Sequence, residues 1–139
     1  MASTLGVMVR DDETAAFFDA AGDGKLVVQL CGNCGYRQFP QPFTPSTERC
    51  HNCAGTELSW QPVSGRGSLV TWTVLQGRPA ADGTPAEVAV VGVVELDEGP
   101  WVHTQLRDVD PAALTAGMPL AVAFETPEGG EPLPVFRPA

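Results

Sequence analysis

The chain carries all four of its cysteines within one short window, the stretch CGNCGYRQFPQPFTPSTERCHNC of residues 31–53. They form two C-x2-C pairs that are separated by residues 35–49. A C-x2-C turn places two sulfur atoms on the same side of a tight loop, and two such turns can close one tetrahedral site. Gly35 follows the first pair, where the turn needs a left-handed backbone. The pattern therefore predicts one metal centre with the ligands Cys31, Cys34, Cys50 and Cys53.

We expect the metal to be Zn²⁺ in a structural role. A catalytic zinc keeps one position open for water or substrate, whereas four cysteines complete the tetrahedron. His51 lies inside the second pair but is therefore not expected to be a ligand. In so short a segment the metal replaces hydrophobic core. The alternatives are weaker, because a redox pair would need a thioredoxin-like βαβ setting and two disulfides would conflict with a cytoplasmic location.

Charge and hydropathy exclude several classes of partner. The formal net charge is −9, and the single lysine and the arginines are spread along the chain without forming a cluster. Nucleic-acid binding depends on positive charge that displaces counterions from phosphates, so we expect no nucleic acid and no anionic membrane among the partners. No apolar run approaches the roughly 18–20 residues of a spanning helix, and the N-terminus MASTLGVMVRDDE does not resemble a signal peptide. We therefore expect a cytoplasmic protein.

A short helix is predicted ahead of the cysteines, over DDETAAFFDAAGDGKL. Asp11 or Asp12 can cap it, and Gly22 and Gly24 end it. Phe17 and Phe18 give this helix an apolar face. Two interpretations remain open: the face packs on its own domain, or it docks on a partner protein.

Short strands account for most of the remaining chain. KLVVQLC, YRQFP and TELSWQPV predict three strands around the two cysteine turns, which is the layout of a zinc ribbon. From residue 65 about five more follow, and the valine-rich VAVVGVVEL is apolar on both faces and therefore central. One helical turn, capped by Asp110 and ended by Gly117, precedes a late strand. This count fits a Greek-key barrel of the OB type, with a small sandwich as the alternative.

The predicted fold class is therefore mostly β. A short N-terminal helix and a zinc ribbon occupy residues 12–64, and a five-stranded OB-fold barrel occupies residues 65–138. Trp60, Trp72 and Trp101 are a large aromatic load for a barrel of this size, so we expect some of them on the surface.

The sequence contains no recognisable catalytic constellation. A phosphate loop, a G-x-S-x-G elbow and an H-E-x-x-H motif are all absent from the sequence. His103 stands in PWVHTQL without a convincing acid nearby, and an inward or hydrogen-bonded histidine is the simpler interpretation. Arg66 in SGRGS either meets an anion or bridges the two halves of the chain.

In this order of motifs the chain resembles a known family. The quoted features are FF in the helix, G-x-L, C-x2-C-G, FP, a second C-x2-C, W, SGRGSLVTWTVL, VVELDEG, DP…L…GMPLAVAFE and a terminal FRPA. Together they are similar to the acyl-CoA-associated family with a rubredoxin-like zinc ribbon and an OB-fold, known as domain of unknown function 35. The resemblance covers about residues 12–138, and SGRG and GMP make it specific.

The resemblance implies a function that spacing alone does not indicate. Members of the family work with thiolase-like enzymes, including thiolases and the lipid-transfer-protein-like aldolases that shorten steroid side chains, and some work with a MaoC-like enoyl-CoA hydratase. The implied role is a non-catalytic accessory subunit that stabilises the partner and helps to hold or channel the acyl-CoA. Candidate contacts are Phe17 and Phe18 for the partner, and Arg37 and Arg66 for CoA.

Two other functions are weighed against this one. A stand-alone acyl-CoA-binding protein would need arginines for the CoA phosphates, and Arg37, Arg49, Arg66 and Arg78 are available. A nucleic-acid-binding ribbon with an OB-fold is disfavoured by the missing basic groove. Co-elution with a thiolase-like protein would favour the accessory subunit, and an ultraviolet signature of nucleic acid would favour the third function.

Overall fold

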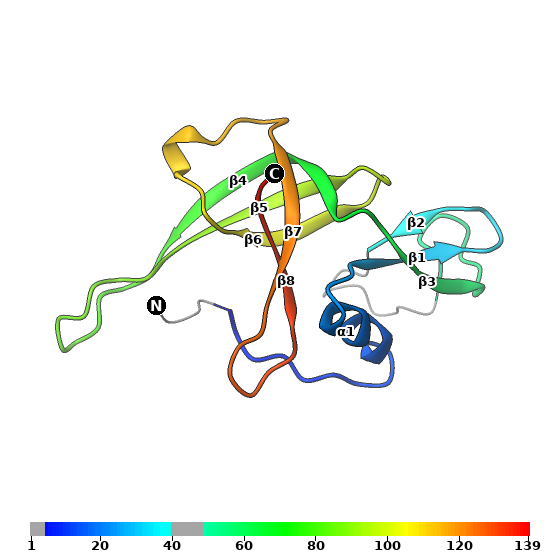
Figure 1. The fold of residues 1–139 in the computed structure, drawn as a ribbon, viewed down its shortest axis with the longest axis horizontal. Coiled ribbons are helices and arrows are strands. Elements are labelled where there is room, and N and C mark those ends of the chain that lie inside the picture. The colour runs from blue at the N-terminus through cyan, green and yellow to red at the C-terminus, as the bar shows by residue number, and fades with distance from the viewer. Residues whose placement is uncertain (1–4, 40–48) are drawn as a thin grey trace.

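The protein consists of a short helix, a small three-stranded sheet and a closed five-stranded barrel (Figure 1). The computed structural model describes residues 5–39 and 49–139. In chain order the elements are α1 (Ala15–Gly22), β1 (Val27–Cys31), β2 (Arg37–Gln38), β3 (Leu58–Pro62), β4 (Arg66–Gln76), β5 (Val88–Leu96), β6 (Trp101–Leu106), the 3-10 turn η1 (Pro111–Ala113), β7 (Pro119–Glu125) and β8 (Leu133–Pro138). Mostly strand, with one short α-helix, is the predicted fold class.

Helix α1 forms where the sequence predicts it, but its N-terminal cap differs. The helix begins at Ala15, and Thr14 is the cap residue without a side-chain cap bond. Asp11 instead accepts hydrogen bonds from the backbone N–H and the hydroxyl of Thr14, at 2.9 and 2.8 Å. The prediction that Asp11 or Asp12 caps the helix is therefore wrong, because Asp11 stabilises the turn that precedes it. Gly24 follows the helix with φ 74°, as expected of a C-terminal glycine.

The three-stranded sheet has the order β2-β1-β3, with both pairs antiparallel. This is the predicted ribbon of three strands around two turns. Pro40, the last residue of the predicted second strand, lies outside the described residues.

The barrel closes in the order β4-β5-β6-β8-β7, which excludes the sandwich alternative. Strand β5 lies between β4 and β6, as its two apolar faces predict. A parallel contact between Leu106 of β6 and Phe136 of β8 completes the closure. The turn η1 is capped by Asp110, whose Oδ1 accepts from the N–H of Ala112 at 3.0 Å.

One hydrophobic core joins the small sheet to the barrel. Leu26 and Val28 are 2 % and 0 % exposed, and they belong to the same buried cluster as Leu69, Val94 and Phe136 of the barrel. Full burial of each such side chain contributes about 1.5–3 kcal/mol to folding. The predicted division at residue 64/65 thus lies where packing continues across the junction, and independent folding of the two parts stays a prediction.

The junction itself depends on close backbone approach. Gly65 has φ 78°, and a Cβ atom there would lie 2.5 Å from Cγ1 of Val122. At Gly67 a Cβ would lie 2.4 Å from the carbonyl oxygen of Glu95. The two glycines of SGRG are therefore required where β4 enters the barrel. Within the described residues, no helix has the length and hydrophobicity needed to cross a lipid bilayer.

Candidate metal centre and partner surfaces

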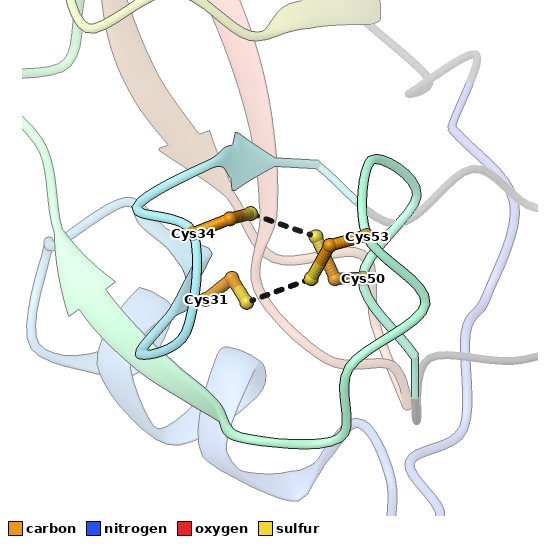
Figure 2. Close-up of side chains that lie close together, drawn as sticks. All are labelled: Cys31, Cys34, Cys50 and Cys53. Atoms are coloured by element: carbon orange, nitrogen blue, oxygen red, sulfur yellow. Dashed lines mark hydrogen bonds between the residues drawn. The ribbon is translucent and has the colours of Figure 1, made fainter.

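The four cysteines converge as their spacing predicts, with all four sulfur atoms within 4.8 Å of one another (Figure 2). The Sγ atoms of Cys31 and Cys53 are 3.7 Å apart, and those of Cys34 and Cys50 are 3.6 Å apart. A tetrahedron with metal–sulfur bonds of about 2.3 Å has edges of about 3.8 Å. A disulfide would need about 2.05 Å, and all four cysteines are free thiols. The donor set and its spacing therefore fit a four-coordinate metal ion.

The two cysteine turns have the same backbone geometry. In each, the residue after the second cysteine has a left-handed conformation, with φ 77° at Gly35 and 61° at Ala54. The N–H of that residue donates to the carbonyl of the first cysteine of its pair, at 2.9 Å in both turns. Each turn places one cysteine inward and one outward, so that Cys31 and Cys50 are buried and Cys34 and Cys53 are exposed.

Hydrogen bonds from asparagine side chains lower the pKa of two of these thiols, whereas burial raises the pKa of a third. The side-chain amide of Asn52 donates to Sγ of Cys34 at 3.6 Å and lowers the pKa of Cys34 to about 6. Asn33 likewise donates to Sγ of Cys53 at 3.6 Å and lowers the pKa of that thiol. Burial raises the pKa of Cys50 to about 11. A bound cation would supply the charge that a buried thiol needs to ionise.

A buried amide network holds the second cysteine turn against the sheet. Gln38 is 3 % exposed, and its Nε2 donates to Oε1 of Gln29 at 3.0 Å and to the carbonyl of Arg49 at 3.1 Å. Its Oε1 accepts from the backbone N–H of His51 at 2.8 Å. This network was not predicted from the sequence, although the two glutamines in short strands beside the cysteines were the available signal. His51 itself is exposed and lies outside the cluster of ligand atoms.

The two phenylalanines of α1 lie in different environments. Phe18 is 5 % exposed, so its side chain packs within this chain. Phe17 is half-buried and contacts Phe18, Phe39 and Trp60 with ring-centroid distances of 5.5, 5.7 and 6.0 Å. These contacts favour packing on the protein's own interior, and docking through Phe17 stays a prediction.

The two arginines proposed for CoA are not brought to one groove. Arg37 lines a groove of about 550 Å³ between the small sheet and the β5–β6 turn. Arg66 is exposed at the start of β4 and does not line it. The other principal side chains of the groove are Tyr36, Phe39, His51, Glu98 and Trp101. This groove can offer an anionic ligand one guanidinium and one imidazole, next to two exposed aromatic rings.

His103 is exposed on β6 rather than directed inward, which leaves the hydrogen-bonded histidine as the open alternative. Of the three tryptophans, Trp101 is 52 % exposed, while Trp60 and Trp72 are half-buried. The expectation that some of this aromatic load lies on the surface is therefore confirmed for Trp101. In the part of the chain that the structure describes, the cysteine cluster is the single group of three or more histidine, cysteine or acidic side chains placed to hold a metal ion.

Comparisons with known proteins agree with this architecture. Residues 60–125 match the sequence family described as the C-terminal OB-fold domain of ChsH2. A "DUF35 domain-containing scaffold protein" of Methanocaldococcus jannaschii is 32 % identical over 100 residues, which are 71 % of this chain and 67 % of that protein. A "probable enoyl-CoA hydratase alpha subunit" of Thermomonospora curvata is 30 % identical over 128 residues. That alignment covers 91 % of this chain but 38 % of the longer relative.

A solved structure extends the similarity to nearly the whole chain. A chain of the Ltp2-ChsH2(DUF35) aldolase superposes with a TM-score of 0.74 at 27 % identity, covering 94 % of this chain and 98 % of that one. The similarity therefore includes the cysteine-bearing sheet as well as the barrel. Ribbon, barrel, family match and relatives lead to one conclusion: the chain belongs to the DUF35 family, with an OB-fold of the ChsH2 C-terminal type.

Proposed function

We propose that this chain is a non-catalytic accessory subunit that binds and stabilises a thiolase-superfamily acyl-CoA enzyme. One observation carries the proposal: the fold is similar over 94 % of its length to a chain of an Ltp2-ChsH2(DUF35) aldolase. The scaffold name of the Methanocaldococcus relative supports the same role. The proposed partners are a thiolase or a lipid-transfer-protein-like aldolase, including those that act on CoA esters of steroid side chains.

The proposed metal is Zn²⁺, held by Cys31, Cys34, Cys50 and Cys53. Sulfur spacings of 3.6 and 3.7 Å support a tetrahedral four-thiolate centre. Four protein ligands leave no open position for water or substrate, so the metal acts by organising the small sheet. When bound, zinc supplies charge neutralisation for the thiolates and no reaction step.

A second enzyme and the acyl-CoA itself belong to the same proposal. The hydratase name of the Thermomonospora relative supports a MaoC-like enoyl-CoA hydratase as an additional partner. Arg37 is the better-supported of the two arginines for a CoA contact, because its groove also presents His51 and the exposed Tyr36. Arg66 remains a candidate only if the partner completes a second anion site.

The alternative function is a stand-alone acyl-CoA-binding protein, and the Arg37 groove is the observation that favours it. Calorimetry with free CoA separates the two functions. The accessory-subunit proposal expects no binding, or only millimolar binding, by the isolated chain. Micromolar binding that is lost in Arg37→Met and kept in Arg66→Met would favour the alternative. Nucleic-acid binding is a weaker candidate, because the net charge is −9.

Co-expression tests the main proposal. The tagged chain is expressed with each thiolase-fold subunit of the source organism in turn, and each pair is purified and assayed. We expect one subunit to co-purify in fixed stoichiometry, to lose yield or activity when expressed alone, and to regain it with this chain. If every thiolase-fold subunit is fully active and soluble by itself and none co-purifies, the proposal is wrong.

A further inference from the structure

We propose that the outer face of the β4–β5–β6 sheet is the surface on which the partner enzyme subunit docks. This inference rests on the proposed function and assigns it a surface that the sequence analysis did not identify. The outer sheet face is defined by Thr71, Leu75, Val91, Val93, Trp101 and His103.

Strand register places these side chains on one face. Thr71 pairs with Val93, and Val93 pairs with His103, so the three form one row across β4, β5 and β6. The alternate residues Val90, Val94 and Val102 point into the barrel and are 9 %, 0 % and 1 % exposed. Because side chains alternate along a strand, the residues of the outer sheet face point away from the barrel core.

The outer sheet face is unusually apolar for a sheet surface in contact with water. The solvated face of an antiparallel sheet is normally polar, yet β5 carries Val91 and Val93 there. Leu75 and Trp101 are each 52 % exposed. The same register also places Thr73, Gln105 and Glu95 on this side of the sheet, and the carboxylate of Glu95, at the Trp101 end, is the one charged group among these residues. Depletion of charge together with aromatic enrichment is typical of the centre of a protein interface.

The projecting part of the β4–β5 hairpin provides a second argument. Pairing of β5 with β6 ends at Val90, whereas β4 and β5 stay paired out to Gln76 and Val88 (Figure 1). A two-stranded hairpin is marginally stable in water without a surface to pack against. A groove of about 550 Å³ crosses the sheet below it, lined by Thr71, Val93 and His103 among others. A protein seated in this groove would also cover Leu75.

Charge identifies the kind of occupant. The corresponding face binds oligonucleotides in other OB-folds, but no lysine or arginine lines this groove, which disfavours a phosphate backbone. At its Trp101 end the face borders Glu95 and Glu98. Trp101 donates from Nε1 to Oε2 of Glu95 at 2.8 Å, which fixes the ring. The complementary surface is therefore a protein patch that is uncharged at its centre and basic where it meets these carboxylates.

Two matched hairpin variants test the inference. Leu75 and Val88 are 52 % and 56 % exposed, but Val88 pairs with Gln76 and lies on the opposite face of the hairpin. In the complex with the co-purifying thiolase-fold subunit, we expect Leu75→Glu to weaken binding at least about tenfold and Val88→Glu to change it less than about twofold. Trp101→Ala is expected to weaken binding as well, and Phe17→Asp tests the helix surface in parallel.

Each outcome decides between the surfaces. If the wild type binds and both Leu75→Glu and Trp101→Ala bind equally well, the outer sheet face is not the docking surface, while the proposed function stands. If the wild type binds no thiolase-fold subunit, the proposed function and this inference fail together. If sedimentation shows that the wild type forms a dimer alone and that Leu75→Glu dissociates it, the occupant is a second copy and the inference is overturned. Hydrogen exchange that slows at residues 71–75, 89–93 and 101–105 on complex formation would support it.

Discussion

The small sheet and the barrel reach a folded state by different physical means. The barrel buries side chains such as Leu120, Val135 and Phe136 to 1 % exposure or less, and its closure leaves no free sheet edge along most of its strands. The small sheet has a two-residue strand, β2, and its second turn is held by the amide of Gln38 next to the cluster of four thiols. A local sequence motif therefore organises the small sheet, whereas the barrel depends on contacts between distant segments.

The largest effect should come from breaking the thiol cluster. Cys34→Ser removes one of four thiolate ligands, so we expect the protein to fall from about one zinc per chain to substoichiometric zinc. The small sheet should lose its structure, while residues 65–138 stay partly folded. Metal analysis of freshly purified protein, together with hydrogen exchange of each region, checks both expectations. A wild type that contains neither zinc nor iron would contradict the metal assignment.

The next effect tests whether the two regions are energetically separate. Leu26 precedes β1 but belongs to the core cluster of the barrel. We expect Leu26→Ala to reduce the free energy of unfolding by about 2–5 kcal/mol and to do so for the barrel as well as for the small sheet. Chemical denaturation monitored by the tryptophans and by hydrogen exchange provides the measurement. Two separate transitions, with the barrel midpoint unchanged, would show that the regions fold independently.

A smaller effect should be confined to the small sheet. Gln38→Ala removes the partner of Gln29 and of the backbone N–H of His51. An unsatisfied buried polar group costs about 1–3 kcal/mol, so zinc should dissociate faster from this variant while the barrel core is unaffected. Gln61→Ala is a control, because Gln61 is exposed on β3. Equal rates of zinc release from both variants and the wild type would show that the hydrogen bonds of Gln38 do not help to retain the metal.

The smallest effect concerns an ion pair on the barrel. Arg107 donates from Nε to Glu125 at 2.7 Å, and this hydrogen bond lowers the pKa of Glu125. A carboxyl with a lowered folded pKa stabilises the protein above its unfolded pKa, and this contribution is lost as the pH falls through the folded value. The side chains are 25 % and 35 % exposed, so Glu125→Gln should cost about 1 kcal/mol or less at pH 7 and less than that at pH 3. The difference is measured by denaturation of the variant and the wild type at both pH values. Any release of metal by acid affects both proteins alike.

The parts of the fold that were predicted are those encoded by local patterns. The C-x2-C pairs, Gly24 after the helix, the Asp110 cap and the alternation within strands each act over a few residues. The cap at Asp11 or Asp12 was predicted wrongly, because either aspartate could serve and the helix starts at Ala15. Periodicity also could not reveal that Leu26 and Val28 join the core of the barrel, since that contact depends on how two separate sheets pack.

The candidate sites also differ in whether a local pattern or the packing of distant strands determines them. The cysteine cluster followed from spacing, and its sulfur atoms converge as predicted for a metal site. Whether a strand residue is exposed depends on which side of the closed barrel it faces. In β4, the bulge between Leu69 and Thr71 changes which residues face outward, and the sequence pattern does not show this bulge. His103 lies exposed on β6, so the inward alternative is wrong, while the alternative of a hydrogen-bonded histidine stays open. The sequence shows that VAVVGVVEL has two apolar faces, but it does not show which of them lies on the outside of the barrel. The outer sheet face was therefore not predicted.

The most direct test of the account is native mass spectrometry of the complex formed with a co-expressed thiolase-fold subunit. We expect a stable heteromeric assembly in which each copy of this chain carries one zinc, and we expect the isolated chain to have no acyl-CoA-cleaving activity. Removal of zinc by a chelator at elevated temperature should release this chain from the assembly, because the small sheet and the barrel share one core. A chain that stays monomeric beside every thiolase-fold subunit, or that cleaves acyl-CoA substrates alone, would contradict the account.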